Sequence, residues 1–206
     1  MNESELQKLK LYYKIYVNKP KYVFKSCQKD WIVVLEKIED TITNENRQAD
    51  IYDYDFATFR GSHFKVASII NKFTLEPVYT ITNSCFLKST VTYVVGEIVC
   101  ADIFDPHSNN VISNGIHYFL SIDQAFYYEL DTKGDYNGKF VEWFANGKLR
   151  CARFYVDGIK FGQSIEINEW NKMTIIAYFY KKKEEAIFKE IYLENNVVYT
   201  ANENIF

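Results

Sequence analysis

The hydrophobic and polar positions along most of the chain alternate as in β-strands. Residues 31–37 (WIVVLEK) form a compact apolar run between polar neighbours, which is typical of a buried strand. Residues 39–54 are polar and predict a connection. Three further runs rich in Val, Ile, Thr and Tyr predict strands at residues 64–73, 78–86 and 90–101. Gly96, inside the last run, predicts a β-bulge.

Two segments carry the signals of helices. Residues 4–16 predict a short helix that cannot continue past Pro20, because their apolar residues recur at helical spacing: Leu6, Leu9, Tyr12 and Tyr13. Residues 115–130 predict a strand that enters a helix, in which Ser121 is the N-cap and Gln124 closes a capping box.

From Gly134 onward, strand-length pieces alternate with turn signals. The doublets Asn146–Gly147 and Asp157–Gly158 predict type I′ turns, because both central residues of each tolerate positive φ. The sequence therefore predicts an α+β protein of predominantly antiparallel β-structure. A mixed amino-terminal unit at residues 1–133 is followed by a β-hairpin meander at residues 134–206.

The meander contains an internal repeat. A shift of 24 positions carries Gly138 onto Gly162, Trp143 onto Ile167 and Tyr155 onto Phe179. The second copy of the repeat is degenerate, since the shift also places Asp157 on Lys181.

The composition of the chain argues against several classes of protein. A chain of 206 residues with 48% hydrophobic content buries a core of its own. Four widely spaced cysteines without a CxxC pair and three scattered histidines predict neither a disulfide framework nor a metal site: Cys27, Cys85, Cys100, Cys151, His63, His107 and His117. A formal net charge of -3 argues against a general nucleic-acid binder. The absence of a run of about 18 apolar residues predicts a soluble, intracellular chain without a transmembrane segment.

The charge is unevenly distributed. Residues 1–26 carry six lysines against two glutamates, whereas residues 35–60 carry seven acidic side chains against three basic ones. The stretch at residues 10–25 mixes lysines with tyrosines, a composition that can follow a nucleic-acid backbone. We favour the alternative of a solvated helix or strand, whose lysines keep the chain soluble and can dock on the acidic neighbour. Net charge does not separate the two readings.

The repeat residues resemble a known family. Gly138–Gly162 resembles the variant MORN (membrane occupation and recognition nexus) repeat at Trp143, Phe144, Asn146, Gly147, Tyr155, Asp157, Gly158 and Gly162. Together with residues 31–47, 93–105 and 109–130, it makes about residues 31–165 similar to the MORN-repeat proteins of giant DNA viruses, in which an uncharacterised α+β unit precedes the repeats. We expect a short, capped array, because Asn171, Lys182 and Ala186 replace the glycines of a further repeat.

The resemblance implies a non-enzymatic interaction or scaffolding protein, without a cofactor, in the cytoplasm of an infected host cell or in the virion. The alternative is an ADP-ribosyltransferase-like enzyme that uses NAD. Residues 115–128 resemble the Gly-Ile-Tyr-Phe stretch of poly(ADP-ribose) polymerases, but none of the three histidines is followed by the glycine of that family. No nucleophile elbow, P-loop or dinucleotide fingerprint is present.

Glu45, Arg47 and His117 form the alternative candidate, a polar site in which the histidine would act as a base. An ordinary turn at residues 43–47 and a hydrogen-bonded interior histidine account for the same residues.

The end of the chain is the preferred candidate surface. Residues 197–206 contain neither proline nor lysine, and residues 173–180 are apolar on both alternating faces. Coverage by the amino-terminal unit is the other reading of these strands. We expect association with a second copy or with a viral or host protein through Ile176, Tyr178, Tyr180, Val198, Tyr199 and Phe206.

Overall fold

The computed structural model describes residues 2–47, 51–84, 90–168, 173–182, 185–194 and 197–203, the last three ranges as backbone only. The chain forms two compact units. The amino-terminal unit consists of Ser4–Leu130 and Phe144–Lys148. The carboxy-terminal unit consists mainly of Asp131–Trp143 and Leu149–Phe206. The predicted division into residues 1–133 and 134–206 stays a prediction, since a compact unit is not by itself an independently folding domain.

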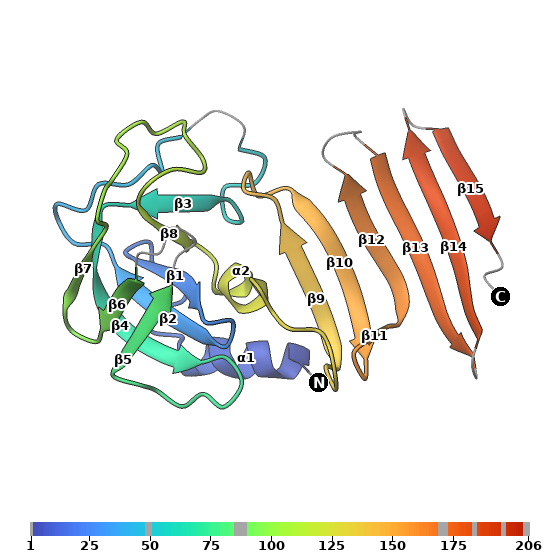
Figure 1. The fold of residues 1–206 in the computed structure, drawn as a ribbon, viewed down its shortest axis with the longest axis horizontal. Helices are drawn as coiled ribbons and strands as arrows, with labels where there is room; N and C mark the ends of the chain where they lie inside the picture. The colour runs from blue at the N-terminus through green and yellow to red at the C-terminus, as the bar shows by residue number, and fades with distance from the viewer. Residues whose placement is uncertain are drawn as a thin grey trace. The chain divides into compact units, whose positions relative to one another are not determined.

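The amino-terminal unit is built on a six-stranded sheet of order β3-β8-β1-β2-β4-β7, in which all described pairings are antiparallel (Figure 1). Its strands are β1 (Tyr22–Cys27), β2 (Trp31–Glu36), β3 (Thr58–Gly61), β4 (His63–Asn71), β7 (Ile98–Cys100) and β8 (Ile116–Phe119). A two-stranded sheet pairs β5 (Thr80–Ser84) with β6 (Thr90–Val94). The helices are α1 (Asn2–Tyr12) and α2 (Ile122–Tyr127).

An apolar run of the sequence forms part of the core of the amino-terminal unit. Ile32, Val33, Val34 and Leu35 of β2 are all fully buried, so successive side chains on both faces of the sheet are covered. This confirms the buried strand predicted at residues 31–37.

Several local predictions were wrong in detail. The apolar stripe of α1 is narrower than expected, because Tyr12 is 60% exposed. Gly96 adopts φ +90° in a turn rather than a bulge, and this turn separates β6 from β7. The predicted N-cap is confirmed, because the Ser121 hydroxyl accepts the N–H of Asp123 at the start of α2. Gln124 closes no capping box, since its amide donates to the carbonyl of Phe56 at 2.7 Å.

The carboxy-terminal unit is a seven-stranded antiparallel meander, which confirms the predicted fold class (Figure 1). Its strands are β9 (Gly138–Trp143), β10 (Leu149–Val156), β11 (Ile159–Lys160), β12 (Gly162–Asn168), β13 (Met173–Lys182), β14 (Glu185–Glu194) and β15 (Val197–Glu203). The order is β11-β10-β12-β13-β14-β15, and β9 also pairs with β10.

The two turn doublets behave differently. Asp157 and Gly158 both have positive φ, and the flanking Val156 and Ile159 are paired, as a type I′ turn requires. At the other doublet only Gly147 has positive φ. There the N–H of Gly147 donates to the carbonyl of Phe144, so the predicted type I′ turn is replaced by a longer connection. This connection belongs to the amino-terminal unit.

The 24-residue repeat found in the sequence also appears in the pairing of the strands. Gly138 faces Tyr155 across the β9–β10 pair, and Gly162 faces Phe179 across the β12–β13 pair. Val141 and Ala152 likewise correspond to Ile165 and Ile176. The two hairpins therefore have the same register over this stretch.

Candidate functional site

The preferred candidate is the edge of the carboxy-terminal sheet. β15 pairs with β14 along its whole length, from Val197 to Glu203. Figure 1 shows it as the outermost strand of this sheet, and no strand in the described part of the chain pairs with its other side. An edge of this kind presents unpaired N–H and C=O groups to an approaching strand.

The register determines which backbone groups of β15 face outward. Glu194 and Val197 are opposite each other across a two-residue connection, and residues flanking such a connection exchange hydrogen bonds. Hydrogen-bonded and non-hydrogen-bonded pairs alternate along an antiparallel ladder. Val198, Thr200 and Asn202 therefore direct their N–H and C=O groups to the open side.

The same alternation follows independently from the preceding hairpin. Lys182 and Glu185 also flank a two-residue connection, so Glu185 and every second residue after it bond to β13. Glu194 then belongs to the set that bonds to β15, in agreement with its pairing to Val197.

The predicted surface residues lie on two strands of this sheet. Ile176, Tyr178 and Tyr180 belong to β13, which β12 and β14 flank on both sides, so they are not at an edge. Val198 and Tyr199 belong to β15. Phe206 lies outside the described residues, and of the other five the backbone alone is described.

Glu45 of the alternative polar site is bound into the fold. Its carboxylate accepts hydrogen bonds from Tyr118 Oη at 2.7 Å and from Lys37 Nζ at 2.9 and 3.0 Å. Burial of the Tyr118 ring, reinforced by the Glu45 charge, raises the pKa of this phenol far above its usual range. Tyr118 is thus a permanent donor that ties the polar connection to the sheet.

Arg47 and His117 lie in other surroundings. Arg47 Nη2 donates to the carbonyl of Ala145 at 3.1 Å, and its guanidinium stacks over Phe59. His117 is next to Tyr118 in β8 and so projects from the opposite face. The described hydrogen bonds of the Glu45 carboxylate run to Lys37 and Tyr118, and that of Arg47 runs to Ala145.

Burial of the His117 ring lowers its pKa to about 4, and the charges of Lys25 and Arg60 act in the same direction. The imidazole is therefore neutral at physiological pH. Its Nε2 atom is buried without a hydrogen-bond partner among the described residues.

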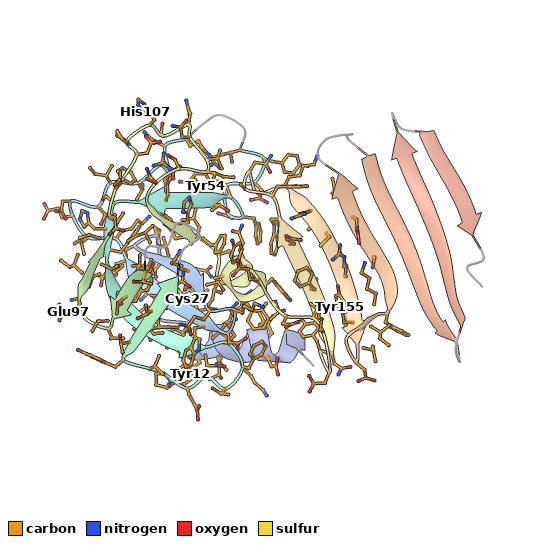
Figure 2. The ribbon with its side chains drawn as sticks, viewed as in Figure 1. Tyr12, Cys27, Tyr54, Glu97, His107 and Tyr155 are labelled. Carbon is orange, nitrogen blue, oxygen red and sulfur yellow. The ribbon has the colours of Figure 1, made fainter. Side chains whose placement is uncertain are left out.

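Sequence patterns missed Arg60, which is fully buried and organises a surface loop. Its guanidinium donates to four backbone carbonyls of the loop, those of Asp105, His107, Asn110 and Asn114. The side chains of Asn110 and Ser113 and the N–H of His107 bind the Asp105 carboxylate and hold its pKa far below the usual range. Figure 2 shows His107 at the outer margin of the fold.

A second buried cation is Lys72. Its ammonium donates to Ser26 Oγ at 2.9 Å and to the carbonyl of Tyr128 at 3.1 Å. Burial lowers the pKa of Lys72 to about 7, against the partly compensating charges of Asp30 and Glu129. The side chain is fully enclosed, so it holds the end of α2 against β1 rather than meeting a ligand.

Ser62, His63 and Asp40 form a hydrogen-bonded series. Ser62 Oγ lies 2.9 Å from His63 Nδ1, and His63 Nε2 lies 3.0 Å from Asp40 Oδ1. This order corresponds to nucleophile, base and orienting acid. However, the Asp40 side chain is 81% exposed, and Ser62 Oγ also accepts the N–H of Ile42 at 3.1 Å. The series fastens residues 40–42 to the β3–β4 corner.

The basic amino-terminal stretch is partly neutralised. Lys10 pairs with Asp123 at 2.7 Å, and Lys21 pairs with Glu36 at 2.8 Å. Only the Lys21–Glu36 pair reaches the acidic stretch at residues 35–60, since Asp123 belongs to α2. In the described part of the chain, no helix has the length and apolar character needed to cross a membrane.

Comparison with known protein families gives a match for most of the amino-terminal unit. Residues 13–125, more than half of the chain, match the model of a family of unknown function, DUF5758. The match ends inside α2 and includes none of the strands β9 to β15. No curated protein and no solved structure matches the chain. The chain belongs to the DUF5758 family.

Proposed function

We propose that this chain is a non-enzymatic module for protein association or scaffolding, and that it associates through β15. The observation that carries the proposal is the open side of this strand, where Val198, Thr200 and Asn202 present backbone donors and acceptors. An added strand from another protein would satisfy these groups, which is the common mode of β-augmentation. The resemblance to viral MORN-repeat proteins supports a viral or host partner, or a second copy, in the infected cell or the virion.

The edge can be tested without disturbing the pairing of β15 with β14. Thr200 directs its N–H outward, so Thr200→Pro removes an edge donor and leaves the inward hydrogen bonds in place. Thr200→Val is the matched control, because it retains the N–H and the preference for a strand. Circular dichroism of both variants checks that the sheet forms.

The full chain and the two variants are compared by light scattering and as immobilised baits in lysate of infected cells. We expect self-association, or the capture of a specific protein, with the wild type and Thr200→Val, and its loss with Thr200→Pro. The same behaviour of all three chains in both measurements would refute association through β15.

The ADP-ribosyltransferase reading is kept as a second proposal, because β8 leads directly into α2 as that likeness predicts. Incubation with labelled NAD tests it. Transfer of label that is lost in His117→Asn would favour the enzyme, whereas no transfer by the full chain would count against it.

A further inference from the structure

We infer that β15 pairs with β15 of a second copy, antiparallel and in the register that places Thr200 opposite Thr200 of that copy. This inference rests on the proposed use of the β15 edge and specifies its partner. It follows from the position of the outward-facing groups within the strand.

The outward set is symmetric about the middle of the strand. Thr200 is the central residue of Val197–Glu203, and it is itself one of the residues that direct their backbone groups outward. A two-fold axis at Thr200 brings Val198 opposite Asn202 of the second copy. All three outward residues then meet outward residues, which gives about six hydrogen bonds between the copies.

Other two-fold registers use the edge less completely. An axis at Tyr199 or at Ala201 pairs only two of the three outward residues with each other and sets the third against a position outside the described residues 197–203. An axis between two residues sets outward groups against inward ones, and an antiparallel ladder cannot form that way.

Charge is compatible with the same register. Glu203 is the only charged residue of β15, and in this register it faces Val197 of the second copy. The two carboxylates therefore lie at opposite ends of the pairing. β15 contains neither the lysine nor the proline with which natural edge strands oppose such pairing. Edge pairing alone buries less area than a standard interface, so we expect a weak dimer at tens of micromolar.

Cysteine cross-linking distinguishes the registers. In the inferred dimer the two copies of Thr200 form a hydrogen-bonded pair with Cα atoms about 5.5 Å apart, within reach of a disulfide. Two copies of Val198 lie four residues out of register, roughly 13 Å apart along the strands, which is too far.

Single variants Thr200→Cys, Val198→Cys and Asn202→Cys are made in the full chain and oxidised gently, and the disulfides are located by mass spectrometry of peptides. We expect a symmetric disulfide at position 200, formed at least tenfold faster than one at position 198. Mixing the Val198→Cys and Asn202→Cys chains should yield a disulfide between positions 198 and 202.

Equal cross-linking at positions 198 and 200, or no cross-link at position 200, would overturn the inference. A wild-type chain that is monomeric at tens of micromolar would do the same. In either case the proposed function still stands if another protein binds the wild type and Thr200→Val but not Thr200→Pro, so the two failures are distinguishable.

Discussion

The ammonium of Lys72 lies 2.9 Å from the hydroxyl of Ser26, and both residues are buried in the amino-terminal unit. Burial lowers the pKa of Lys72 to about 7 from its ordinary value of 10.5. Between these two values the unfolded chain binds a proton that the folded chain releases, so folding becomes more favourable as the pH rises.

We therefore expect the wild-type free energy of unfolding to contain a term that increases from pH 7 to pH 10, by at most about 1.4 kcal/mol per pH unit. Lys72→Met should remove this term, and Lys65→Met, an exposed change on β4, the strand that ends one residue before Lys72, should retain it. Urea denaturation across this range measures both. Parallel pH profiles for the wild type and Lys72→Met would contradict the assignment.

Arg60→Lys should loosen the loop that follows residue 103. A lysine ammonium cannot reach the four carbonyls that the planar guanidinium serves, so we expect a loss of about 3 kcal/mol or more. Urea denaturation measures the loss, and limited proteolysis should cut the loop faster. The control is Arg150→Lys, whose side chain is 55% exposed in its ion pair with Glu142 and should cost less than about 1 kcal/mol. Similar losses for both variants would exclude a special role of Arg60.

Gly147→Ala should be much more destabilising than Gly96→Ala. Both glycines have positive φ, +84° and +90°, so both substitutions carry a similar backbone strain of about 1 kcal/mol. A Cβ at position 147 would in addition overlap the carbonyl of Asp53, whereas one at position 96 meets nothing within 4 Å. We expect Gly147→Ala to cost at least about 2 kcal/mol more in thermal or urea unfolding. Equal costs would show that the connection at Gly147 moves away freely.

The sequence predicted elements whose cause is local. The apolar run of β2 and the Asp157–Gly158 turn depend on neighbouring residues, and both formed as expected. The β1–β2 hairpin was missed because Gln28 and Lys29 adopt positive φ without glycine, asparagine or aspartate to signal it. Tertiary pairing of the two strands stabilises that turn.

For the candidate sites too, the sequence predicted the features that depend on neighbouring residues and missed those that depend on distant ones. The lack of proline and lysine in residues 197–206 predicted a poorly protected strand, and Val197–Glu203 is the outer strand of the sheet. The role of Arg60 was invisible because its partners lie about 50 positions away along the chain. Glu45 was grouped with His117, but alternation in β8 turns His117 away from the face on which Tyr118 meets Glu45.

Because burial favours the neutral form of the His117 ring, we expect the free energy of unfolding to fall in acid. Burial lowers its folded-state pKa to about 4 from 6.5, so the unfolded chain takes up a proton first as the pH falls between these values. The full shift corresponds to about 3 kcal/mol, and we expect roughly half of it because the ring is only partly buried. His117→Asn should flatten the fall in unfolding free energy from pH 6.5 to pH 4, measured by urea denaturation. His107→Asn, a change in an exposed loop residue, should leave the fall as in the wild type. An NMR titration gives an independent check, since the His117 ring proton should shift with a midpoint near pH 4. A midpoint near 6.5 would mean that the ring is solvated and that the acid instability originates elsewhere.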